Sequence, residues 1–384
     1  MVDISSLYSG VRQVYGKMAR STSEYATMPP LRVTFEVTYR CNLSCPFCFQ
    51  EIAREESPEF RKDYELSTKE LSDTIAALPR YSLITFNGGE VFVRKDFPDL
   101  LREISRQGRR FNIVTNGTML FDDKVKLLVD ETNALSVGIS IDGIGKTHDE
   151  IRRLPKAFDR TVKNMRELVA YRQQSAKRFP VVDMKTVITE ENVAELVDIY
   201  DLGSDIGVDY LTFSCLRTSE LIFALPCRES MDDGAYAELP PPLDLNIDLK
   251  LLRNQLETIQ AKAKRGGPAV RFYPDYSGIE GIIKYYAGRG EMADYEPCNA
   301  PWTNVRVAPN GDVYPCLSYR MGNIREQGLM DIWKGENLSR FRSLFTEGNV
   351  AACMACCNLK ACADISSSSG LSAEPAQDLI ALNA

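Results

Sequence analysis

Histidine is nearly absent from this sequence, because His148 is the only one among 384 residues. A single imidazole excludes metal centres that need several, such as His-rich zinc sites and non-haem iron triads, and it leaves one candidate for a histidine base. Lysine and arginine number 46 against 53 aspartates and glutamates, which gives a net charge of −7. That balance argues against general affinity for nucleic acid or anionic membranes, although a local basic patch is compatible with it.

Long apolar runs are also missing. No segment approaches the roughly 18–20 consecutive apolar residues that a membrane-spanning helix needs. The N-terminal residues lack the apolar core of an export signal, so we expect a cytoplasmic protein with no membrane partner. Hydrophobic residues make up 44% of the chain, which is enough for a sizeable globular core.

Cysteine, by contrast, is abundant and clustered. Of the 11 cysteines, three lie within 41–48 and four within 353–362. A disulfide framework is uncommon in a chain of this length without an export signal, whereas clustered thiols in a reducing compartment more often hold metal. The two clusters are therefore candidate metal sites.

A strand-then-helix rhythm fills residues 31–214. The predicted strands are 31–38, 81–86, 111–115, 134–141, 181–188 and 208–214, and the predicted helices are about 67–79, 97–107, 122–131, 158–177 and 192–202. Six such α/β units imply a parallel sheet with helices packed outside it, either as an open doubly wound sheet or as a partial barrel.

The first cysteine cluster, CNLSCPFC, has the spacing Cys41-x3-Cys45-x2-Cys48 directly after the first predicted strand. Sites in α/β folds gather at this carboxyl end of the strands. Three thiolates are one too few for a closed four-cysteine site, so they favour a [4Fe–4S] cluster with one open iron. The alternatives are three buried cysteines or a zinc loop with a distant fourth ligand.

At these residues the chain resembles the radical SAM superfamily. The resemblance implies a partial (β/α)6 TIM-type barrel whose open iron binds S-adenosylmethionine (SAM). One electron from the cluster would cleave the sulfonium to methionine and a 5′-deoxyadenosyl radical, which abstracts hydrogen from a substrate. Phe47, between the second and third cysteines, matches the family position that packs on the adenine.

Residues after the second and third predicted strands strengthen the resemblance. Gly88, Gly89 and Glu90 look like the family's segment for the SAM amino group, with the glycines allowing close approach and Glu90 offering a carboxylate. Asn116 ends the third strand in a Thr-Asn-Gly sequence. Each of these residues alone would be an ordinary turn, but together they predict a cofactor site.

The fourth predicted strand ends in Ser140 and Asp142, where family members bind the ribose. Arg152, ten residues after Asp142, matches an arginine that pairs with the SAM carboxylate. His148 lies between them, and we expect it to be a structural hydrogen-bonding residue rather than a catalyst.

The second cysteine set begins with Cys298 and Cys316, which bracket a predicted hairpin with its turn at 309–311. Further along the chain lie Cys353, Cys356, Cys357 and Cys362. Two distant thiol pairs that converge would form a four-cysteine centre, either iron–sulfur or zinc.

This region resembles the SPASM/twitch domains of radical SAM enzymes. A full SPASM domain has seven cysteines and two auxiliary clusters, whereas here Ser366 occupies an expected cysteine position and no cysteine follows it. The resemblance therefore implies one auxiliary [4Fe–4S] cluster. Its implied ligands are Cys298, Cys316, Cys353 and Cys356, with Cys362 or Cys357 as alternatives to one of the last two.

Cys215 follows the sixth predicted strand. A buried packing cysteine is the favoured interpretation, and the alternative is a thiol that donates a hydrogen atom to a substrate radical. Asp149, Lys185 and Arg217 are further polar candidates without an assigned role.

The expected domains are an N-terminal extension (1–30), the barrel (31–215), a bridging region (216–297), the small cysteine-rich domain (298–365) and a flexible tail (366–384). We expect a radical SAM enzyme of natural-product biosynthesis acting on a small polar metabolite, by dehydrogenation, epimerisation or decarboxylation. One alternative is a maturase of ribosomally made peptides, and another is a non-catalytic iron–sulfur electron carrier or redox sensor. A flavodoxin- or ferredoxin-type protein is the expected electron donor.

Overall fold

The computed structural model describes residues 11, 14–20, 28–48, 50–51, 64–216, 246–273, 278–288, 291–316, 319–356 and 360–361. Of the features named above, the tail at 366–384 lies outside these ranges, as do Cys357, Cys362 and Arg217. No helix within the ranges is both long enough and apolar enough to cross a membrane.

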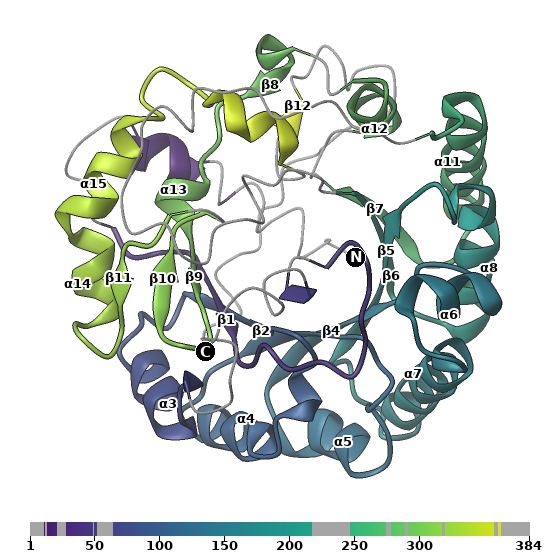
Figure 1. Ribbon diagram of the computed structural model, residues 1–384. Coiled ribbons are helices and arrows are strands. Elements are labelled where there is room, and N and C mark those ends of the chain that lie inside the picture. The colour runs from purple at the N-terminus through teal and green to yellow at the C-terminus, as the bar shows by residue number, and fades with distance from the viewer. Residues whose placement is uncertain are drawn as a thin grey trace.

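A ten-stranded sheet forms the centre of the fold (Figure 1). Six consecutive strands of this sheet are parallel and adjacent in chain order, with helices on the outside, as the sequence predicts. They are β1 (Arg32–Glu36), β2 (Leu83–Asn87), β3 (Phe111–Thr115), β4 (Ala134–Ser140), β5 (Val181–Ile188) and β6 (Tyr210–Cys215). Each is short and rich in β-branched or aromatic residues, which suits a sheet buried under helices.

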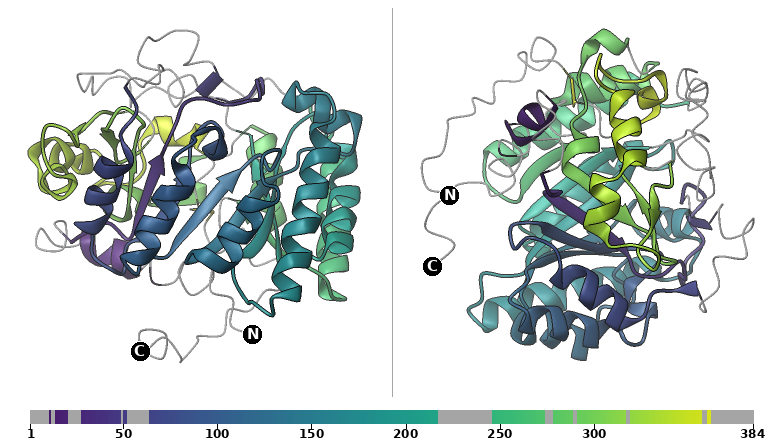
Figure 2. Two further views of the ribbon diagram at one scale, coloured as in Figure 1. Left: turned by 90° about the horizontal axis from the view of Figure 1, so that it is seen from below. Right: turned by 90° about the vertical axis from the view of Figure 1, so that its left-hand side faces the viewer.

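Amphipathic helices cover the outer face of the sheet (Figure 2). They are α3 (Thr68–Ala76), α4 (Phe97–Arg106), α5 (Asp123–Lys126), α6 (Lys146–Arg152), α7 (Ala157–Gln174) and α8 (Leu196–Ile206). α4 illustrates the cause, because its buried residues recur at the i, i+3, i+4, i+7 spacing of one helix face. These residues are Phe97, Leu100, Leu101 and Ile104.

Local signals set the helix ends. A capping box is present at the start of α3, where the side chains of Ser67 and Glu70 accept hydrogen bonds from each other's backbone N–H groups. The helix predicted at 122–131 is instead the short α5 followed by a π-helical turn, Leu127–Glu131. Short 3₁₀ turns lie at Val91–Val93, Val193–Glu195, Met292–Asp294 and Ala351–Ala355.

The bridging region adds a seventh parallel strand that the sequence pattern did not predict. The bridging region also contains the helix α11 (Leu249–Lys264). It is followed by β7 (Ala269–Tyr273), which pairs with β6, and by α12 (Gly278–Tyr286). Phe272 of β7 packs against Phe213 of β6, with their ring centroids 6.4 Å apart.

The C-terminal segment continues the barrel sheet from its other end. β9 (Asn304–Val307) pairs in parallel with β1, and β10 (Asp312–Tyr314) and β11 (Gly322–Asn323) follow as antiparallel strands. The views in Figures 1 and 2 agree that these elements lie against the start of the barrel. The remaining elements are α13 (Ala300–Thr303), α14 (Leu329–Lys334), α15 (Glu336–Ser343) and the two-stranded pair β8 (Tyr295–Glu296) with β12 (Lys360–Ala361).

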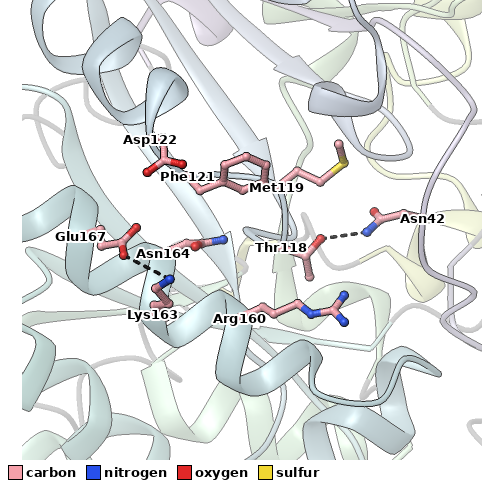
Figure 3. Close-up of a pocket in the computed structure, with 9 residues that line it drawn as sticks. All are labelled: Asn42, Thr118, Met119, Phe121, Asp122, Arg160, Lys163, Asn164 and Glu167. Carbon is pink, nitrogen blue, oxygen red and sulfur yellow. Dashed lines mark hydrogen bonds and ion pairs between the residues drawn. The ribbon is translucent and has the colours of Figure 1, made fainter.

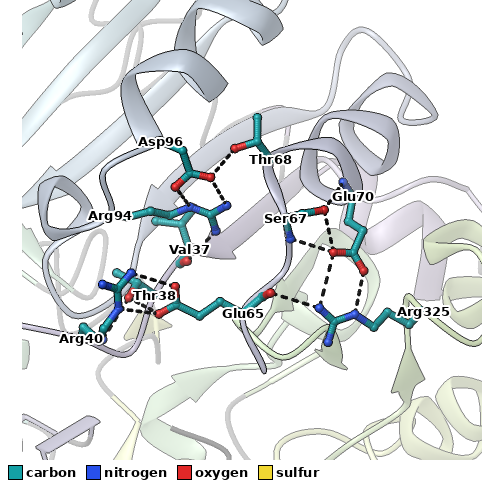
Figure 4. Close-up of polar contacts among 10 residues, drawn as sticks. All are labelled: Val37, Thr38, Arg40, Glu65, Ser67, Thr68, Glu70, Arg94, Asp96 and Arg325. Carbon is teal, nitrogen blue, oxygen red and sulfur yellow. Dashed lines mark hydrogen bonds and ion pairs between the residues drawn. The ribbon is translucent and has the colours of Figure 1, made fainter. Parts of the chain in front are cut away.

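A chain of polar contacts joins this C-terminal segment to the residues just before Cys41 (Figure 4). Arg325 donates to the Glu70 carboxylate at 2.7 Å and to the backbone oxygen of Glu65 at 3.1 Å. The Glu65 carboxylate in turn accepts from the Arg40 guanidinium at 2.9 and 3.0 Å and from the Thr38 hydroxyl at 2.5 Å. The residues just before Cys41 are therefore linked both to the barrel and to the C-terminal segment.

Candidate functional site

The three cysteines of the first motif lie on one loop at the carboxyl end of β1. Two tight contacts shape this loop, since Leu43 N–H points at the Cys41 sulfur at 3.4 Å and Cys48 N–H bonds the Cys45 oxygen at 3.1 Å. Burial raises the pKa of Cys41 to about 12, and the neighbouring thiols of Cys45 and Cys48 add to the rise. Burial also raises the pKa of Cys48.

These thiols suit a cluster better than a single ion. Zinc holds sulfur at about 2.3 Å, so its ligands must come within about 4 Å of one another. Nowhere in the described ranges do three Cys, His, Asp or Glu side chains gather tightly enough for a single metal ion. The thiols of Cys45 and Cys48 lie near enough to Cys41 to raise its pKa. Three neighbouring thiols suit an iron–sulfur cluster, and its binding would displace the thiol protons.

Gly88 and Gly89 bring the segment after β2 against the cluster loop. A Cβ on Gly89 would lie 2.2 Å from the Arg40 carbonyl oxygen, and one on Gly88, whose φ is +147°, would lie 2.5 Å from that of Thr38. The two segments are also hydrogen-bonded, from Gly89 N–H to Thr38 and from Glu90 N–H to Arg40, at 2.8 and 2.9 Å. The glycines are thus needed for backbone packing against the residues that precede Cys41.

Glu90 is fully buried and binds the end of the next strand. Its carboxylate accepts from the Thr115 hydroxyl at 2.7 Å, from Asn116 N–H at 2.8 Å and from Phe92 N–H at 3.2 Å. Burial raises the pKa of Glu90 despite these bonds. A carboxylate has about four acceptor positions, so one is left for an ammonium group, and that role stays a prediction.

Asn116 extends this network to the cluster loop. Its side-chain amide donates to the Asn42 oxygen at 3.0 Å and lies 3.9 Å from the Cys41 sulfur. Asn42 then donates to the Thr118 hydroxyl at 2.9 Å. The sequence analysis did not single out Asn42 or Thr118, although Asn42 stands inside the cysteine motif.

Asp142 and Arg152 form a buried ion pair beside the cluster loop. Arg152 also donates toward the Cys45 sulfur at 3.6 Å, and its guanidinium lies 5.8 Å from the centre of the Phe47 ring. Burial opposes the charge on Arg152, yet the Asp142 carboxylate and the Cys45 thiol raise the pKa of Arg152 overall. The residues expected at the adenine, ribose and carboxylate of SAM therefore lie together.

Two neighbours of this pair have structural contacts. The Nδ1 atom of His148 accepts from Asp142 N–H at 3.1 Å, and burial lowers the pKa of His148 to about 3, so a neutral, hydrogen-bonding imidazole fits. Both carboxylate oxygens of Asp149 accept backbone N–H groups at the start of α7, at 2.6 and 2.9 Å. Ser140 ends β4 opposite Lys185 of β5 and is half-buried.

The second set of cysteines also converges. Burial raises the pKa of Cys353 well above its usual range, and the nearby thiols of Cys298, Cys316 and Cys356 raise it further. The four thiols come from three places in the C-terminal segment, because Cys353 and Cys356 lie together at the 3₁₀ turn Ala351–Ala355. Cys298 is held by Asn349, which accepts its N–H at 2.6 Å. Four converging thiols fit an auxiliary cluster, whereas the alternatives Cys357 and Cys362 lie outside the described residues.

Cys215 is 2% exposed and belongs to the apolar core. It shares a face of β6 with Leu211, whose side chain packs against Gly203 of α8, so its surroundings resemble those of a packing cysteine. Its role as a hydrogen-atom donor stays a prediction. Lys185 donates at 2.5 Å to Asp183, a buried carboxylate that Arg271 of β7 also approaches at 3.9 Å. The sequence analysis did not identify Arg271, because it did not predict β7, the strand in which Arg271 lies.

Comparison with known proteins agrees with this geometry. The model of the radical SAM superfamily matches residues 35–203, and that of an iron–sulfur cluster-binding domain, SPASM, matches residues 298–358. The first match spans β1 to α8 and includes the three-cysteine loop. The second match includes the four converging cysteines, Cys298, Cys316, Cys353 and Cys356.

Individual relatives cover most of the chain. The tungsten-containing aldehyde ferredoxin oxidoreductase cofactor-modifying protein of Pyrococcus furiosus is 27% identical over 85% of this chain and 87% of its own length. The mycofactocin maturase MftC of Mycobacterium tuberculosis is 27% identical over 87% of this chain and 77% of its own. The structure of Streptococcus suis SuiB bound to S-adenosylmethionine has a TM-score of 0.58 at 18% identity, covering 82% of this chain and 68% of SuiB. The chain therefore belongs to the radical SAM superfamily, as an enzyme that uses S-adenosylmethionine and a [4Fe–4S] cluster and that carries a C-terminal SPASM domain for auxiliary iron–sulfur.

Proposed function

We propose that this enzyme activates an unreactive C–H bond of a ribosomally made peptide. The observation that carries the radical chemistry is the single loop that presents Cys41, Cys45 and Cys48 beside a buried Asp142–Arg152 pair. The cluster, when bound, supplies the electron that cleaves SAM to methionine and a 5′-deoxyadenosyl radical. Because the chain belongs to a superfamily of enzymes, we do not favour the alternative of a non-catalytic electron carrier or redox sensor.

In this proposal the protein's own residues orient SAM. Cys41, Cys45 and Cys48 would hold three irons of the cluster, and Arg152, which contacts both Asp142 and the Cys45 sulfur, would bind the SAM carboxylate. Phe47 would offer its ring to the adenine. The burial of Cys45, Asp142 and Arg152 would exclude water from a cofactor bound beside them.

The remaining proposed contacts come from the neighbouring strand ends. Gly88, Gly89 and Glu90 would lie at the amino group of SAM, and Ser140 with Asp142 would lie at its ribose. Asn116 fixes the cluster loop from the side, through its contacts with Asn42 and Cys41.

A peptide substrate is supported by solved structures of the same fold. SuiB has been solved with its precursor peptide SuiA, with a TM-score of 0.58 and 18% identity over 82% of this chain. That likeness concerns the fold, so the peptide is a proposal for this chain. Of the two relatives named above, the maturase is compatible with a substrate larger than a metabolite, whereas the cofactor-modifying protein is equally compatible with a small one.

A small polar metabolite is the second candidate substrate, because charged side chains lie on β5 and β7, the two strands that flank β6. Asp183, Lys185 and Arg271 come together across β5 and β7, and the side chains of Lys185 and Arg271 are 33% and 27% exposed. Such partly exposed cations can bind a carboxylate or phosphate of a small substrate.

We propose one auxiliary [4Fe–4S] cluster, held by Cys298, Cys316, Cys353 and Cys356. Iron and sulfide analysis of anaerobically reconstituted protein checks the number. About eight irons per chain support one auxiliary cluster, because two [4Fe–4S] clusters hold that many. About twelve would require a second auxiliary cluster, and zinc in the second site would contradict the assignment. Cys362→Ser should leave the iron content unchanged.

Anaerobic incubation with SAM and dithionite tests the proposed chemistry. We expect 5′-deoxyadenosine from the wild-type protein and none from Cys41→Ala, Cys45→Ala or Cys48→Ala, because each lacks one ligand of the cluster. Cys298→Ala should reduce substrate turnover or folding more than SAM cleavage. Cleavage retained by any of the first three variants would refute the cluster assignment.

The substrate class needs its own measurement. Deuterium placed in a candidate peptide should appear in 5′-deoxyadenosine, and the peptide mass should change in the same reaction. Deuterium transfer from a phosphorylated or carboxylated small metabolite, with none from the peptide, would favour the second candidate. The genes beside this one supply both sets of candidates.

A further inference from the structure

The pocket of about 520 Å³ beside the first cluster loop has balanced charges (Figure 3). It is lined by two cations and two carboxylates, Arg160, Lys163, Asp122 and Glu167, and Lys163 reaches Glu167 at 3.7 Å. This pocket therefore shows no preference for a ligand of one charge. The balance differs beside the second set of cysteines, where two arginines have no acidic partner among the described residues.

These two arginines are Arg20 and Arg342. Arg342 is 5% exposed, and its guanidinium donates to the carbonyl oxygens of Pro301 and Trp333 at 3.0 and 3.3 Å. Arg20 donates to the carbonyl oxygen of Cys298 at 2.5 Å. Burial lowers the pKa of both side chains, to about 10 for Arg342. Positive charge that is removed from water in this way is costly unless an anion lies nearby.

Arg20 reaches Cys298 from the other end of the chain. The N-terminal helix that includes Gly16 and Arg20 packs against the turn that begins at Cys298 (Figure 1). A Cβ on Gly16 would lie 2.4 Å from the Cβ of Asn299, so a larger residue would push the helix and the turn apart. The Arg20 guanidinium also lies over the Trp302 ring, 4.9 Å from its centre. These contacts fix Arg20 beside the cysteine.

The surroundings of the Cys298 sulfur favour negative charge. Ala300 N–H points at this sulfur at 3.4 Å, and such a donor stabilises a thiolate. The Cys298 thiol raises the pKa of Arg20 against the effect of burial, so the guanidinium is within electrostatic reach of the sulfur. A [4Fe–4S] cluster on four thiolates is an anion, and its reduction adds one more negative charge. Such a cluster would supply the counter-charge that Arg20 lacks among the described residues.

We propose that Arg20 is a positioning residue of the auxiliary cluster: its guanidinium fixes the Cys298 ligand and favours the reduced, more negative form, so it raises the reduction potential. The inference rests on the proposed function, which places one [4Fe–4S] cluster on Cys298, Cys316, Cys353 and Cys356. Net charge and hydrogen bonds near the sulfurs are among the properties that set such potentials. With Arg20 in place the cluster accepts an electron more readily, and without it a stronger reductant would be needed.

Potentiometric titration of the auxiliary cluster tests this role. The full chain carrying Cys41→Ala/Cys45→Ala/Cys48→Ala serves as the parent, because its electron paramagnetic resonance signal comes from the second site alone. Adding Arg20→Gln keeps an amide that can donate and removes the charge. We expect one-electron reduction to become about tenfold less favourable, which is a fall of about 59 mV in midpoint potential. Arg20→Lys keeps the charge and should stay within about threefold of the parent.

Lys17→Gln in the same parent is the matched control. Lys17 is an exposed side chain of the same helix, so its replacement makes the same charge change without touching Cys298. The equilibrium constant for reduction should then stay within about twofold. An equal fall in potential in Lys17→Gln or in Arg20→Lys would overturn the inference, because the charge at Arg20 would not be its cause.

Iron content separates this inference from the proposed cluster. An unchanged midpoint in Arg20→Gln, with about four irons still bound per chain, would overturn the role of Arg20 and leave the auxiliary cluster in place. Loss of iron from Arg20→Gln but not from Arg20→Lys would support the role, because only the charge differs in kind. Loss from both variants would overturn it in favour of a purely structural contact. A parent without iron would refute the proposed auxiliary cluster together with this inference.

Discussion

Replacing Glu90 by glutamine should weaken both the fold and the SAM site. The carboxylate accepts three hydrogen bonds in a fully buried position, from Phe92 N–H, the Thr115 hydroxyl and Asn116 N–H. Glutamine has the same shape but one acceptor oxygen, and its NH₂ group would face an N–H donor, most simply that of Asn116. A lost bond to a buried charged group costs about 1.5–3 kcal/mol.

The lower desolvation of a neutral side chain offsets part of that cost. Burial raises the pKa of Glu90, so the charged form is already disfavoured and a neutral side chain avoids its desolvation. We therefore expect a net loss of about 1–2 kcal/mol, which corresponds to a fall of roughly 1–3 °C in the unfolding midpoint of a chain of this size. Differential scanning calorimetry of the apo protein measures it.

The functional effect should be larger than the loss of stability suggests. Asn116 contacts both Asn42 and the Cys41 sulfur, so a shift of the strand end carries over to the cluster loop. We expect the dissociation constant of SAM to rise about tenfold, which is about 1.4 kcal/mol, in anaerobic calorimetric titration of the reconstituted protein.

Thr115→Val is the matched control for this experiment. It removes the bond from the Thr115 hydroxyl to Glu90 and the bond from Gly117 N–H to that hydroxyl, but it leaves the bond from Asn116 N–H to Glu90, so SAM affinity should stay within about twofold while stability falls by about 1–3 kcal/mol. Wild-type SAM affinity in Glu90→Gln would refute the reasoning. Equal losses of affinity in the two variants would also refute it, because Asn116 would then not be the connecting residue.

Two further predictions follow from buried or bridging charges. Arg325→Ala should destabilise the protein by about 1 kcal/mol in urea unfolding, since its partner Glu70 is 37% exposed and the pair is screened by solvent. Arg325 lowers the pKa of Glu70 to about 2, so the ion pair stabilises above the ordinary Glu pKa of 4.5, and the difference between wild type and variant should shrink as the pH of apo protein falls from 4.5 to 2, leaving the contribution of the bonds from Arg325 to backbone oxygens. Asp142→Asn should cost about 3–5 kcal/mol, because it leaves the Arg152 charge buried without its partner, and bound SAM should restore part of that loss in thermal unfolding. An unchanged midpoint in either variant would contradict the corresponding pair.

The six α/β units were predictable from the sequence because each depends on local patterning. Alternating β-branched strands and the capping box at Ser67 and Glu70 need no distant partner, and both are present. β7 was missed because Gly266, Gly267 and Pro268 precede it and break any regular pattern. Its place in the sheet depends on pairing with β6, which is separated from it by a long connection.

The site was predictable as a set of residues but not as a set of contacts. The spacing of the cysteines and the residues at strand ends indicated which positions matter. Which side chains meet depends on the order of strands in the sheet, so the bond from Asn116 to Glu90 follows from β2 and β3 being neighbours. The same applies to Asp142 and Arg152, which were expected at different parts of SAM and are paired with each other.

The pairing of β9 with β1 changes how the two cluster regions relate. β1 leads into the loop of Cys41, and β9 lies between Cys298 and Cys316 in the chain. Arg306 of β9, whose side chain is 14% exposed, bonds the buried carboxylate of Glu36 in β1 at 2.9 Å, so separating the strands would leave the Glu36 charge unpaired in the core. Loss of the auxiliary site should therefore loosen β9 and, through β1, the first cluster loop. A moderate fall in SAM cleavage in Cys298→Ala is then a mechanical consequence of one continuous sheet, and it should be rescued by lower temperature, whereas an electronic role for the auxiliary cluster in SAM cleavage would not be.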